Sequence, residues 1–364
     1  MAYEIDFLPV GNGDRSGDAI ALRWWDGSAF KVMVYDGGTK DSGQTLVNHI
    51  QQHYGTKRVD YVVNSHPDAD HASGLSVVME QLEVGEVWMH RPWAHSSVIC
   101  DYFKDGRITD NSLADRLKEK MAAAYAVEQL AVARGIPVKE PFQGAYIGPF
   151  LVLSPSRDWY IHDLVPAFAK SPEQKTVAED SASMILSAIA GVVRSALDWI
   201  DEEWNVETLR ENVTTSAEND SSVILLGVLA DKGILLCGDA GVQALDRATD
   251  YCDYLGTHLP TLLNFVQVPH HGSRNNVSSS VLDKILGPKK LVDDGQHSKT
   301  AFVSASANSK THPRQVVINA FVRRGVNVVP TKDSTKNHRY NLPVREGWST
   351  VEGLKYSPQV ESWE

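Results

Sequence analysis

The stretch His66-Pro67-Asp68-Ala69-Asp70-His71 places two histidines and two aspartates close together in the chain. It follows an apolar strand predicted at Tyr61-Val62-Val63 and precedes the small residues Ala72-Ser73-Gly74, which predict a turn. A loop at a strand end can direct several side chains into one space, whereas a strand sends its side chains alternately to two faces. Carboxylates packed this closely would repel one another, and their pKa values would rise, unless a cation lay between them. Because imidazole and carboxylate ligands together favour zinc, manganese or iron over calcium, the stretch predicts a site for such a metal.

Three further groups of polar residues follow predicted strands later in the chain. They are Gly238-Asp239, Pro269-His270-His271-Gly272-Ser273 and His312-Pro313, after strands predicted at Ile234 to Cys237, Asn264 to Val268 and Ala301 to Ala305. Each has an ordinary interpretation by itself: Gly-Asp is a common turn, paired histidines can fill a core, and His312 can lie on the surface where a helix starts. Their shared position at strand ends instead predicts that they converge on the first cluster.

Strands predominate at both ends of the chain, and helices lie between them. The other predicted strands are Tyr3 to Val10, Ala19 to Trp25, Phe30 to Tyr35, Ser222 to Leu229 and a closing strand at Val326 to Val329. The predicted helices are one that contains Leu46, Val47 and Ile50, one from Ser112 to Arg134, one over about Ser181 to Trp204 and one over about Arg314 to Arg323. The polar segment Asn205 to Glu218 is predicted to be a loop near the site and not part of the core. This order suits two sheets packed face to face with helices outside.

Composition indicates an ordinary globular protein: of 364 residues, 42% are hydrophobic and 22% are charged. The longest apolar stretch, Met184 to Ile200, is interrupted by polar residues and is shorter than the roughly 20 residues that a membrane span needs. Three cysteines without C-x-x-C spacing, and a start without a secretory signal, favour the cytoplasm. The net charge of -11 argues against a long, sequence-independent grip on nucleic acid, although bound metal ions would add local positive charge.

The order H-x-D-x-D-H, G-D, H-H-G-S and H-P resembles the metallo-β-lactamase superfamily, and within it the soluble hydrolase domain of the ComEC group of competence proteins. Three further stretches are similar to that group: Val10-Gly11-Asn12-Gly13-Asp14, Asp36-Gly37-Gly38 and Asn219-Asp220-Ser221-Ser222. The resemblance implies an α/β fold of the four-layer αβ/βα sandwich type. It also implies a single domain over residues 1–364, with insertions at about 91–150 and 155–218.

The resemblance further implies a centre of two divalent metal ions, Zn²⁺ or Mn²⁺, that hold a hydroxide between them. The implied ligands are His66 and Asp68 for one ion, Asp70 and His71 for the other, Asp239 as the bridge, and His271 to complete one coordination sphere. Asp36 would accept a hydrogen bond from a ligand histidine and so orient its ring. His270 or His312 would stabilise the developing charge or protonate the leaving oxygen.

One position departs from the usual superfamily pattern, and one ligand is not identified. Asp68 stands where most members have histidine, which is usual in the ComEC-like group. No histidine in a T-P-G-H context lies between the first cluster and Asp239, so the third ligand of the first ion stays open. Asn219 or Asp220 could lie near it. The remaining candidates, in segments that do not align, are His90, His95 and His162.

The implied chemistry suits hydrolysis of a phosphodiester, either DNA or RNA or a smaller nucleotide or choline phosphodiester. The acidic balance favours a small or short substrate, or a partner protein that supplies a basic surface, and no membrane association is expected. Two alternatives stay open. One is a hydrolase of carboxylic esters, lactones or thioesters that uses the same site. The other is a non-catalytic relative that binds a ligand, which the presence of every expected ligand type disfavours.

Overall fold

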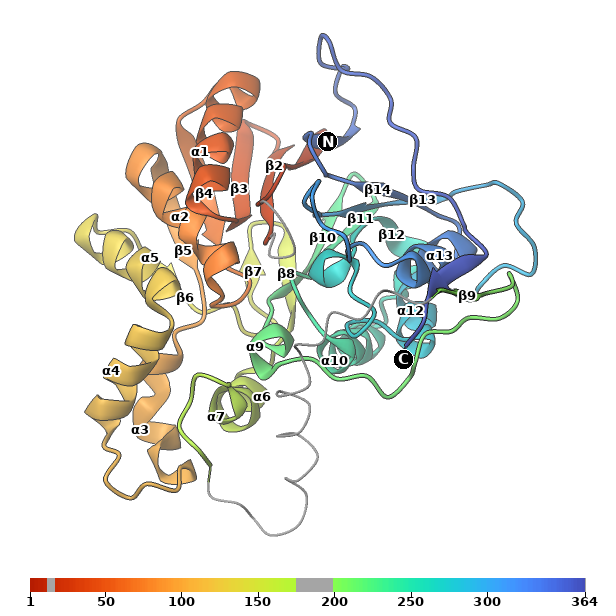
Figure 1. Ribbon diagram of the computed structural model, residues 1–364. Coiled ribbons are helices and arrows are strands. Elements are labelled where there is room, and N and C mark those ends of the chain that lie inside the picture. Colours follow the sequence, from red (N-terminus) through yellow and green to blue (C-terminus); the bar gives the residue numbers. More distant parts are fainter. Residues whose placement is uncertain (12–16, 175–198, 364) are drawn as a thin grey trace.

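The computed structural model describes residues 1–11, 17–174 and 199–363. Within these ranges the chain forms two large sheets that pack face to face, with helices on their outer sides, and one small sheet near the C-terminus (Figure 1). The mixed α/β fold expected from the sequence is therefore confirmed. No helix in the described ranges combines the length and the apolar composition that crossing a bilayer requires.

The strands and helices have the following bounds. The first main sheet contains β1 (Tyr3–Phe7), β2 (Ala19–Trp25), β3 (Phe30–Gly37), β4 (Arg58–Val63), β5 (Glu83–Trp88), β6 (Val138–Lys139) and β15 (Lys336–Tyr340). The second contains β7 (Tyr146–Ile147), β8 (Phe150–Ser154), β10 (Ile224–Leu229), β11 (Lys232–Leu236), β12 (Leu263–Gln267), β13 (Lys299–Val303) and β14 (Val326–Pro330), and the small sheet contains β9 (Trp199–Asp201) and β16 (Gln359–Glu361). The helices are α1 (Lys40–His49), α2 (Ala69–Gln81), α3 (Ser96–Ile99), α4 (Asp110–Lys120), α5 (Ala122–Ala133), α6 (Arg157–Trp159), α7 (Val165–Ala167), α9 (Ala217–Asp220), α10 (Val242–Tyr254), α11 (Leu259–Leu262), α12 (Ser279–Leu286) and α13 (Gln315–Arg323). Short helical turns are η1 (Ile50–Tyr54), η2 (Pro92–His95), η3 (Cys100–Tyr102), η4 (Tyr160–Leu164) and η5 (Pro269–Gly272).

The strand order brings the ends of several parallel strands to one edge of the sandwich. The first main sheet has the order β15-β1-β2-β3-β4-β5-β6, and the second β14-β13-β12-β11-β10-β8-β7. Strands β3 to β6 run parallel to one another, as do β11 to β14. Ligand-binding loops commonly lie at the carboxyl ends of parallel strands. Asp36, His66, Asp239 and His270 occupy or follow these ends in β3, β4, β11 and β12.

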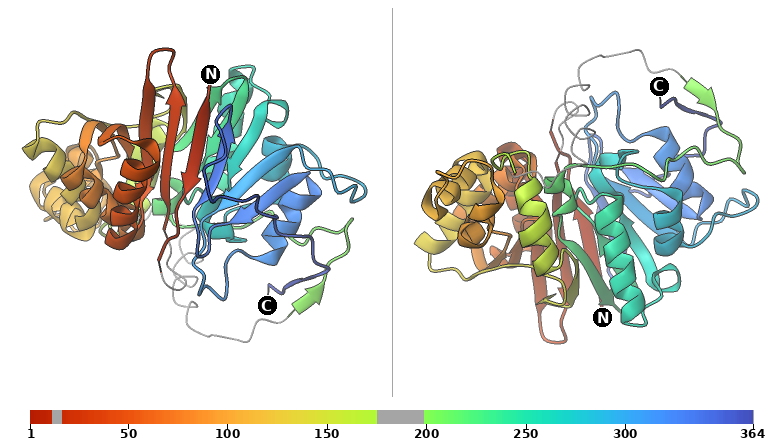
Figure 2. Two further views of the ribbon diagram at one scale, coloured as in Figure 1. Left: turned by 90° about the horizontal axis from the view of Figure 1, so that it is seen from above. Right: turned by 90° about the horizontal axis from the view of Figure 1, so that it is seen from below.

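Both faces of the main sheets are buried, which makes four layers. In β2, Ile20, Leu22 and Trp24 face the second main sheet, whereas Ala19 and Ala21 face the helices. This alternation follows from the two-residue period of a strand. Helices α1 and α2 cover the outer face of the first main sheet, and α10, α12 and α13 that of the second (Figure 2). The arrangement of helix, sheet, sheet and helix agrees with the sandwich expected from the sequence.

Glycine contacts hold α2 unusually close to the end of β3. A Cβ atom on Gly74 would lie 1.9 Å from the carbonyl oxygen of Gly37, and a Cβ atom on Gly37 would lie 2.3 Å from the backbone nitrogen of Leu75. Such an approach of two backbones is open only to glycine. It brings His71, in the first turns of α2, against Asp36 at the end of β3. The Asp36-Gly37-Gly38 stretch therefore has a packing role in addition to its carboxylate.

The structure corrects several predicted elements. The helix predicted from Ser112 to Arg134 is two helices, α4 and α5, because Met121 between them is non-helical (φ -116°, ψ 41°). The predicted turn Ala72-Ser73-Gly74 lies inside α2, where its small side chains serve the close packing on β3. Val326 to Val329 is not the closing strand, since β15 and β16 follow it. Most of the helix predicted over about 181–204 lies outside the described residues, and its end is wrong because β9 occupies Trp199–Asp201.

Asn205 to Glu218 contains no strand, and it is a loop as far as α9, as predicted. The loop is nevertheless anchored in the interior, since Leu209 is buried and Glu207 pairs with Arg324 at 2.8 Å. The expectation that this polar segment is not part of the core is therefore wrong for these two side chains. Strands β6 and β7 lie within residues 91–150, where an insertion was expected, yet each joins a main sheet.

Asp6 in β1 is a buried charge that ties the C-terminal segment to the first main sheet. Its carboxylate lies 2.7 Å from Arg345 and 3.1 Å from His49. Burial by itself would raise the pKa of Asp6, but hydrogen bonds and charges from His49 and Arg345 outweigh it and lower the pKa from 3.8 to about 2. Because the folded pKa is below the unfolded one, this stabilisation is complete above about pH 4 and is lost as the pH falls through about 2.

Asp6→Asn should lower the free energy of unfolding at neutral pH by roughly 3–5 kcal/mol, the usual cost of removing one partner of a buried pair. The difference from the wild type should narrow as the pH is lowered from 4 to 2. Urea unfolding over this pH range measures both effects. Glu352→Gln, which breaks the exposed Lys355–Glu352 pair, is the control and should cost less than about 1 kcal/mol. Equal losses in the two variants would contradict this account.

Candidate metal centre

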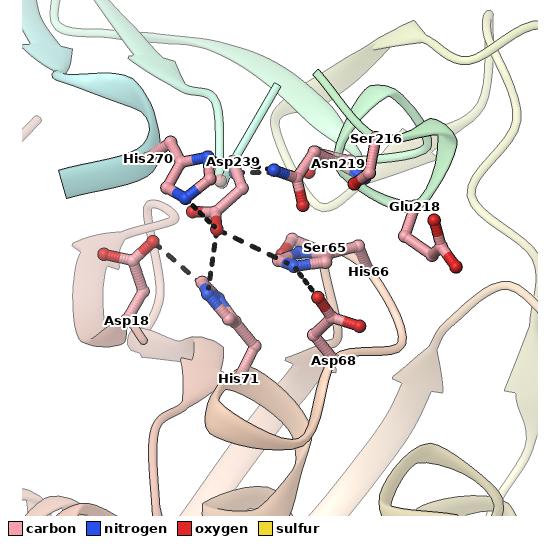
Figure 3. Close-up of polar contacts among 12 residues, drawn as sticks. Asp18, Ser65, His66, Asp68, His71, Ser216, Glu218, Asn219, Asp239 and His270 are labelled. Atoms are coloured by element: carbon pink, nitrogen blue, oxygen red, sulfur yellow. Dashed lines mark hydrogen bonds and ion pairs between the residues drawn. The ribbon is translucent and has the colours of Figure 1, made fainter. Parts of the chain in front are cut away.

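Histidines and aspartates from both main sheets converge on one buried space (Figure 3). Asp239 follows β11, and its Oδ2 lies 3.4 Å from Nε2 of His71 and 3.8 Å from Nε2 of His66. The same oxygen lies 3.8 Å from Nε2 of His270, and Oδ1 lies 3.8 Å from Nε2 of His271. The structure therefore brings Asp239 together with four of the histidines that the sequence singled out.

The donor atoms of this cluster fit divalent cations. Nε2 of His66, Nε2 of His71 and Oδ1 of Asp239 are buried, and within the described residues they have no hydrogen-bond partner. Such atoms are costly to bury unless something pairs with them. The ligand atoms of His71, Asp239 and His271 lie within 4.8 Å of one another and fit one ion. His66 and Asp68, with Nε2 and Oδ2 3.8 Å apart, offer donors for a second position that shares Asp239.

A carboxylate and a hydroxyl behind the cluster set the direction of two histidines. Nδ1 of His71 lies 2.9 Å from Oδ2 of Asp36. Ser65 donates its backbone N–H to Asp36 at 2.7 Å, and its hydroxyl lies 2.9 Å from Nδ1 of His66. With Nδ1 engaged, both rings direct Nε2 into the shared space. Partners of this kind fix the tautomer of a ligand histidine and raise its basicity.

Residues Pro269 to Gly272 form a turn, called the PHHG turn below, that contains two adjacent histidines. Different groups contact the Nδ1 atoms of these two histidines. Nδ1 of His271 lies 3.0 Å from the backbone oxygen of Ser304, which can only accept, so Nδ1 carries the proton and Nε2 keeps a lone pair. Nδ1 of His270 lies 2.9 Å from Nδ2 of Asn219, which can only donate, so the proton of His270 is on Nε2. His271 therefore has the form that a ligand needs, and His270 has the form of a hydrogen-bond donor.

Backbone strain is concentrated at the same place. Asp36, His270 and His271 have φ values of 58°, 44° and 55°, in the left-handed region that residues other than glycine rarely adopt. Each such residue costs on the order of 1–3 kcal/mol, and such strain clusters at functional sites. The left-handed pair turns both imidazoles towards Asp239, which an extended strand would not do with neighbouring side chains.

Electrostatics in the cluster favours positive charge beside Asp239. Burial would raise the pKa of Asp239, but the charges of His270, His71 and His271 outweigh it and hold the pKa well below its usual range. Burial would lower the pKa of His71, but the carboxylates of Asp239 and Asp36 hold it well above its usual range. Burial lowers the pKa of His271 to about 4. A cation that displaces the proton of His71 would meet the same carboxylates.

Asp68 and Asp70 lie beside this space, and the loop that carries His312 packs against Gly272. Asp68 stands at the N-cap of α2, and Asp70 follows in its first turn, where its negative charge acts on His271. The interpretation of His312 as a residue where a helix starts is wrong, because α13 begins at Gln315 and its N-cap is Arg314. The reason is local packing: Pro313 lies against Gly272, where an added Cβ atom would be 2.6 Å from the proline Cβ. The His312 loop is thus held beside the PHHG turn.

Of the open candidates for a third ligand, Asn219 lies at the site and Asp220 does not. The Asp220 carboxylate faces the backbone of Gly241 and Ala244 at the start of α10. The histidines of the segments that did not align have other contacts: His90 stacks on Tyr160, His95 pairs with Glu140, and His162 pairs with Tyr102. Of the V-G-x-G-D stretch, residues 12–14 lie outside the described residues.

Sequence reasoning missed Asp18 and Lys170. Asp18 is fully buried, and its Oδ2 lies 2.8 Å from Nε2 of Gln267 and 3.8 Å from Nδ1 of His71. Burial raises its pKa to about 7, and the carboxylates of the cluster add to the effect of burial. Gln267 also accepts the backbone N–H of Gly238, so it links Asp18 to the turn that carries Asp239. A single aspartate after a glycine offers no pattern that predicts this position. Lys170 contacts Asp68 from a distant segment.

Asp36→Asn should weaken metal binding roughly 10- to 100-fold, the usual effect of changing a group behind a ligand histidine. Asparagine keeps the volume of the side chain but loses the charge that holds Nδ1 of His71. Competition with a chelating dye measures the affinity for Zn²⁺. Asp41→Asn, at an exposed position in the first turn of α1, is the matched control. Wild-type affinity in Asp36→Asn would show that this carboxylate does not support a ligand.

Comparison with known proteins gives one family match and several structural likenesses. Residues 27–98 match the family model of the metallo-beta-lactamase superfamily, and no curated protein matches the chain. Among solved structures, the chain is similar to metallo-beta-lactamase SMB-1 bound to 2-mercaptoethanesulfonate (10% identity, 78% of this chain and 86% of that chain, TM-score 0.32). It is also similar to unliganded yeast PDE1 (10% identity, 93% and 99%, TM-score 0.43) and to a diphosphatase from the PhnP family (12% identity, 94% and 100%, TM-score 0.33). The matched residues 27–98 include His66, Asp68, Asp70 and His71, so the similarity to this superfamily covers the first cluster of candidate ligands.

Proposed function

We propose that the protein is a metal-dependent hydrolase that cleaves a phosphodiester with the help of two divalent ions, Zn²⁺ or Mn²⁺. The observation that carries the proposal is the convergence of His66, His71 and His271 on Asp239, where buried polar atoms have no hydrogen-bond partner among the described residues. Asp239 would be shared by both ions. His66 and Asp68 would hold one ion, and Asp70, His71 and His271 the other.

Some residues of the site would hold the ions, and another would donate a hydrogen bond to the substrate. Divalent ions at such a site polarise a phosphoryl oxygen and lower the pKa of water from about 15.7 towards 7. Asp36 and the carbonyl of Ser304 keep His71 and His271 in the tautomer that presents Nε2 to the ions. Nε2 of His270, which carries a proton because Asn219 donates to Nδ1, is placed to donate a hydrogen bond to an oxygen on which negative charge develops.

The substrate follows from the chemistry and the charge of the chain. Two cations that share one carboxylate suit a phosphodiester anion better than a neutral ester. The net charge of -11 favours a small or short substrate, such as a nucleotide or an oligonucleotide of DNA or RNA, over a long polyanion. A partner protein with a basic surface would allow the protein to act on longer nucleic acids as well. Hydrolysis of carboxylic esters, lactones or thioesters on the same site is the alternative.

A substrate panel tests the proposal. Metal-free protein reconstituted with Zn²⁺ or Mn²⁺ is assayed on bis(p-nitrophenyl) phosphate, cyclic nucleotides, choline phosphodiesters and short DNA and RNA, against lactone, thioester and carboxylic ester substrates. We expect turnover of phosphodiesters that disappears on removal of the metal. Turnover of the lactone or ester alone would establish the alternative. Metal binding without turnover of any substrate would indicate a non-catalytic relative.

We assign His312 to the substrate side of the site, because its loop packs against the PHHG turn through Pro313 and Gly272. His312→Ala should keep both metal ions and lower turnover on the order of 10²–10⁴-fold, the usual size of an acid–base contribution. Elemental analysis and kinetics on one preparation measure both. The exposed variant His297→Ala is the control. Loss of a metal ion in His312→Ala would show that His312 is a ligand instead. Wild-type turnover would show that His312 is not part of the site.

A further inference from the structure

Lys170 supplies a positive charge at one side of the metal centre. It lies in the turn after α7, and its Nζ contacts Oδ1 of Asp68. The backbone of Lys170 is held on both sides: its N–H donates to Glu218 at 3.4 Å, and its carbonyl accepts from Arg116 at 3.3 Å. The lysine is therefore positioned by α9 and α4, and its contact with Asp68 joins segments about 100 residues apart in the chain.

The two metal positions differ in charge because of this lysine. At the position formed by His71, Asp239 and His271, the ion-pair partners of Asp239 among the described residues are histidines. At the other position, Asp68 has one oxygen 3.8 Å from Nε2 of His66 and the other in contact with the ammonium. A divalent ion bound there would share the carboxylate with a fixed positive charge, and like charges at this range repel.

We propose that Lys170 makes the two positions unequal. One divalent ion binds tightly at the His71–Asp239–His271 position, and the second binds more weakly at the His66–Asp68 position, where it competes with the ammonium for Asp68. This inference rests on the proposed metal centre.

Calorimetric titration of the metal-free protein with Zn²⁺, checked by elemental analysis, tests the inference without an activity assay. The wild type should bind in two steps of different affinity. Lys170→Met, which keeps the length and removes the charge, should tighten the weaker step on the order of tenfold and leave the tighter step unchanged. Lys170→Gln is a second neutral variant that should behave in the same way. Lys170→Arg, which keeps the charge, should resemble the wild type.

Two controls locate the effect. Lys104→Met removes a lysine that pairs with Glu173, and Glu173 is close to Lys170 in sequence. This variant should not change either binding step. Asp68→Asn should remove the weaker step alone. Two equal steps in the wild type, or a weaker step that stays the same or loosens in Lys170→Met and Lys170→Gln, would overturn the inference and leave the metal centre standing. Absence of any metal binding would instead overturn the proposed function and this inference with it.

Discussion

Replacing Asp239 by asparagine is expected to remove at least one metal ion and most of the turnover. Its two oxygens face Nε2 atoms of histidines on both sides, at 3.4 Å from His71 and 3.8 Å from His66 and His271. An amide in this place loses the negative charge and offers one ligand atom where there were two. The loss of affinity should exceed the roughly 10- to 100-fold that follows from changing a group behind a ligand.

Elemental analysis of Asp239→Asn, with turnover of bis(p-nitrophenyl) phosphate on the same sample, measures the effect. Asp253→Asn, an exposed position in α10, controls for a general effect of neutralising an aspartate. Circular dichroism and urea unfolding establish that the variant is folded. A full metal complement with unchanged turnover would show that Asp239 does not bridge the ions. The metal ligands would then have to be assigned to other residues.

Replacing the neighbouring residues His270 and His271 one at a time is expected to give different effects on metal content and turnover. His270→Asn is expected to keep both metal ions and to lower turnover on the order of 10²–10³-fold, because it removes a hydrogen-bond donor to the developing negative charge. His271→Asn is expected to lose metal, because it removes a lone pair that faces Asp239 at 3.8 Å. Asparagine is the replacement of choice because it tolerates the left-handed backbone of both positions better than alanine does.

Metal content and turnover are measured together for both variants, with the exposed His258→Ala as the control. Asn219→Ala should reproduce part of the His270→Asn effect, since the ring of His270 then loses the donor that directs its proton to Nε2. If His270→Asn lost metal as His271→Asn does, both histidines would be ligands. The division of roles inferred from their Nδ1 partners would then be wrong.

Much of the site was predictable because its residues follow strands. Side chains at the ends of β4, β11 and β12 have local sequence signals, namely the H-x-D-x-D-H, G-D and H-H-G-S stretches after apolar runs. The turn residues on either side of an apolar run likewise predicted β2 with its observed bounds. Where the prediction was wrong, packing decided: Gly74 looked like a turn residue, but it permits a close helix contact.

By itself, then, the sequence determined which residue types are available and which strand ends carry them, because these depend on neighbours in the chain. Only the tertiary structure decided the rest. It buried Asp18 beside His71, turned Asn219 rather than Asp220 towards His270, and brought Lys170 onto Asp68. The physical reason is that a proton on one imidazole nitrogen, or a charge beside a carboxylate, is set by whichever group approaches through space. The partners here come from segments far apart in the chain, and no local pattern specifies their contact.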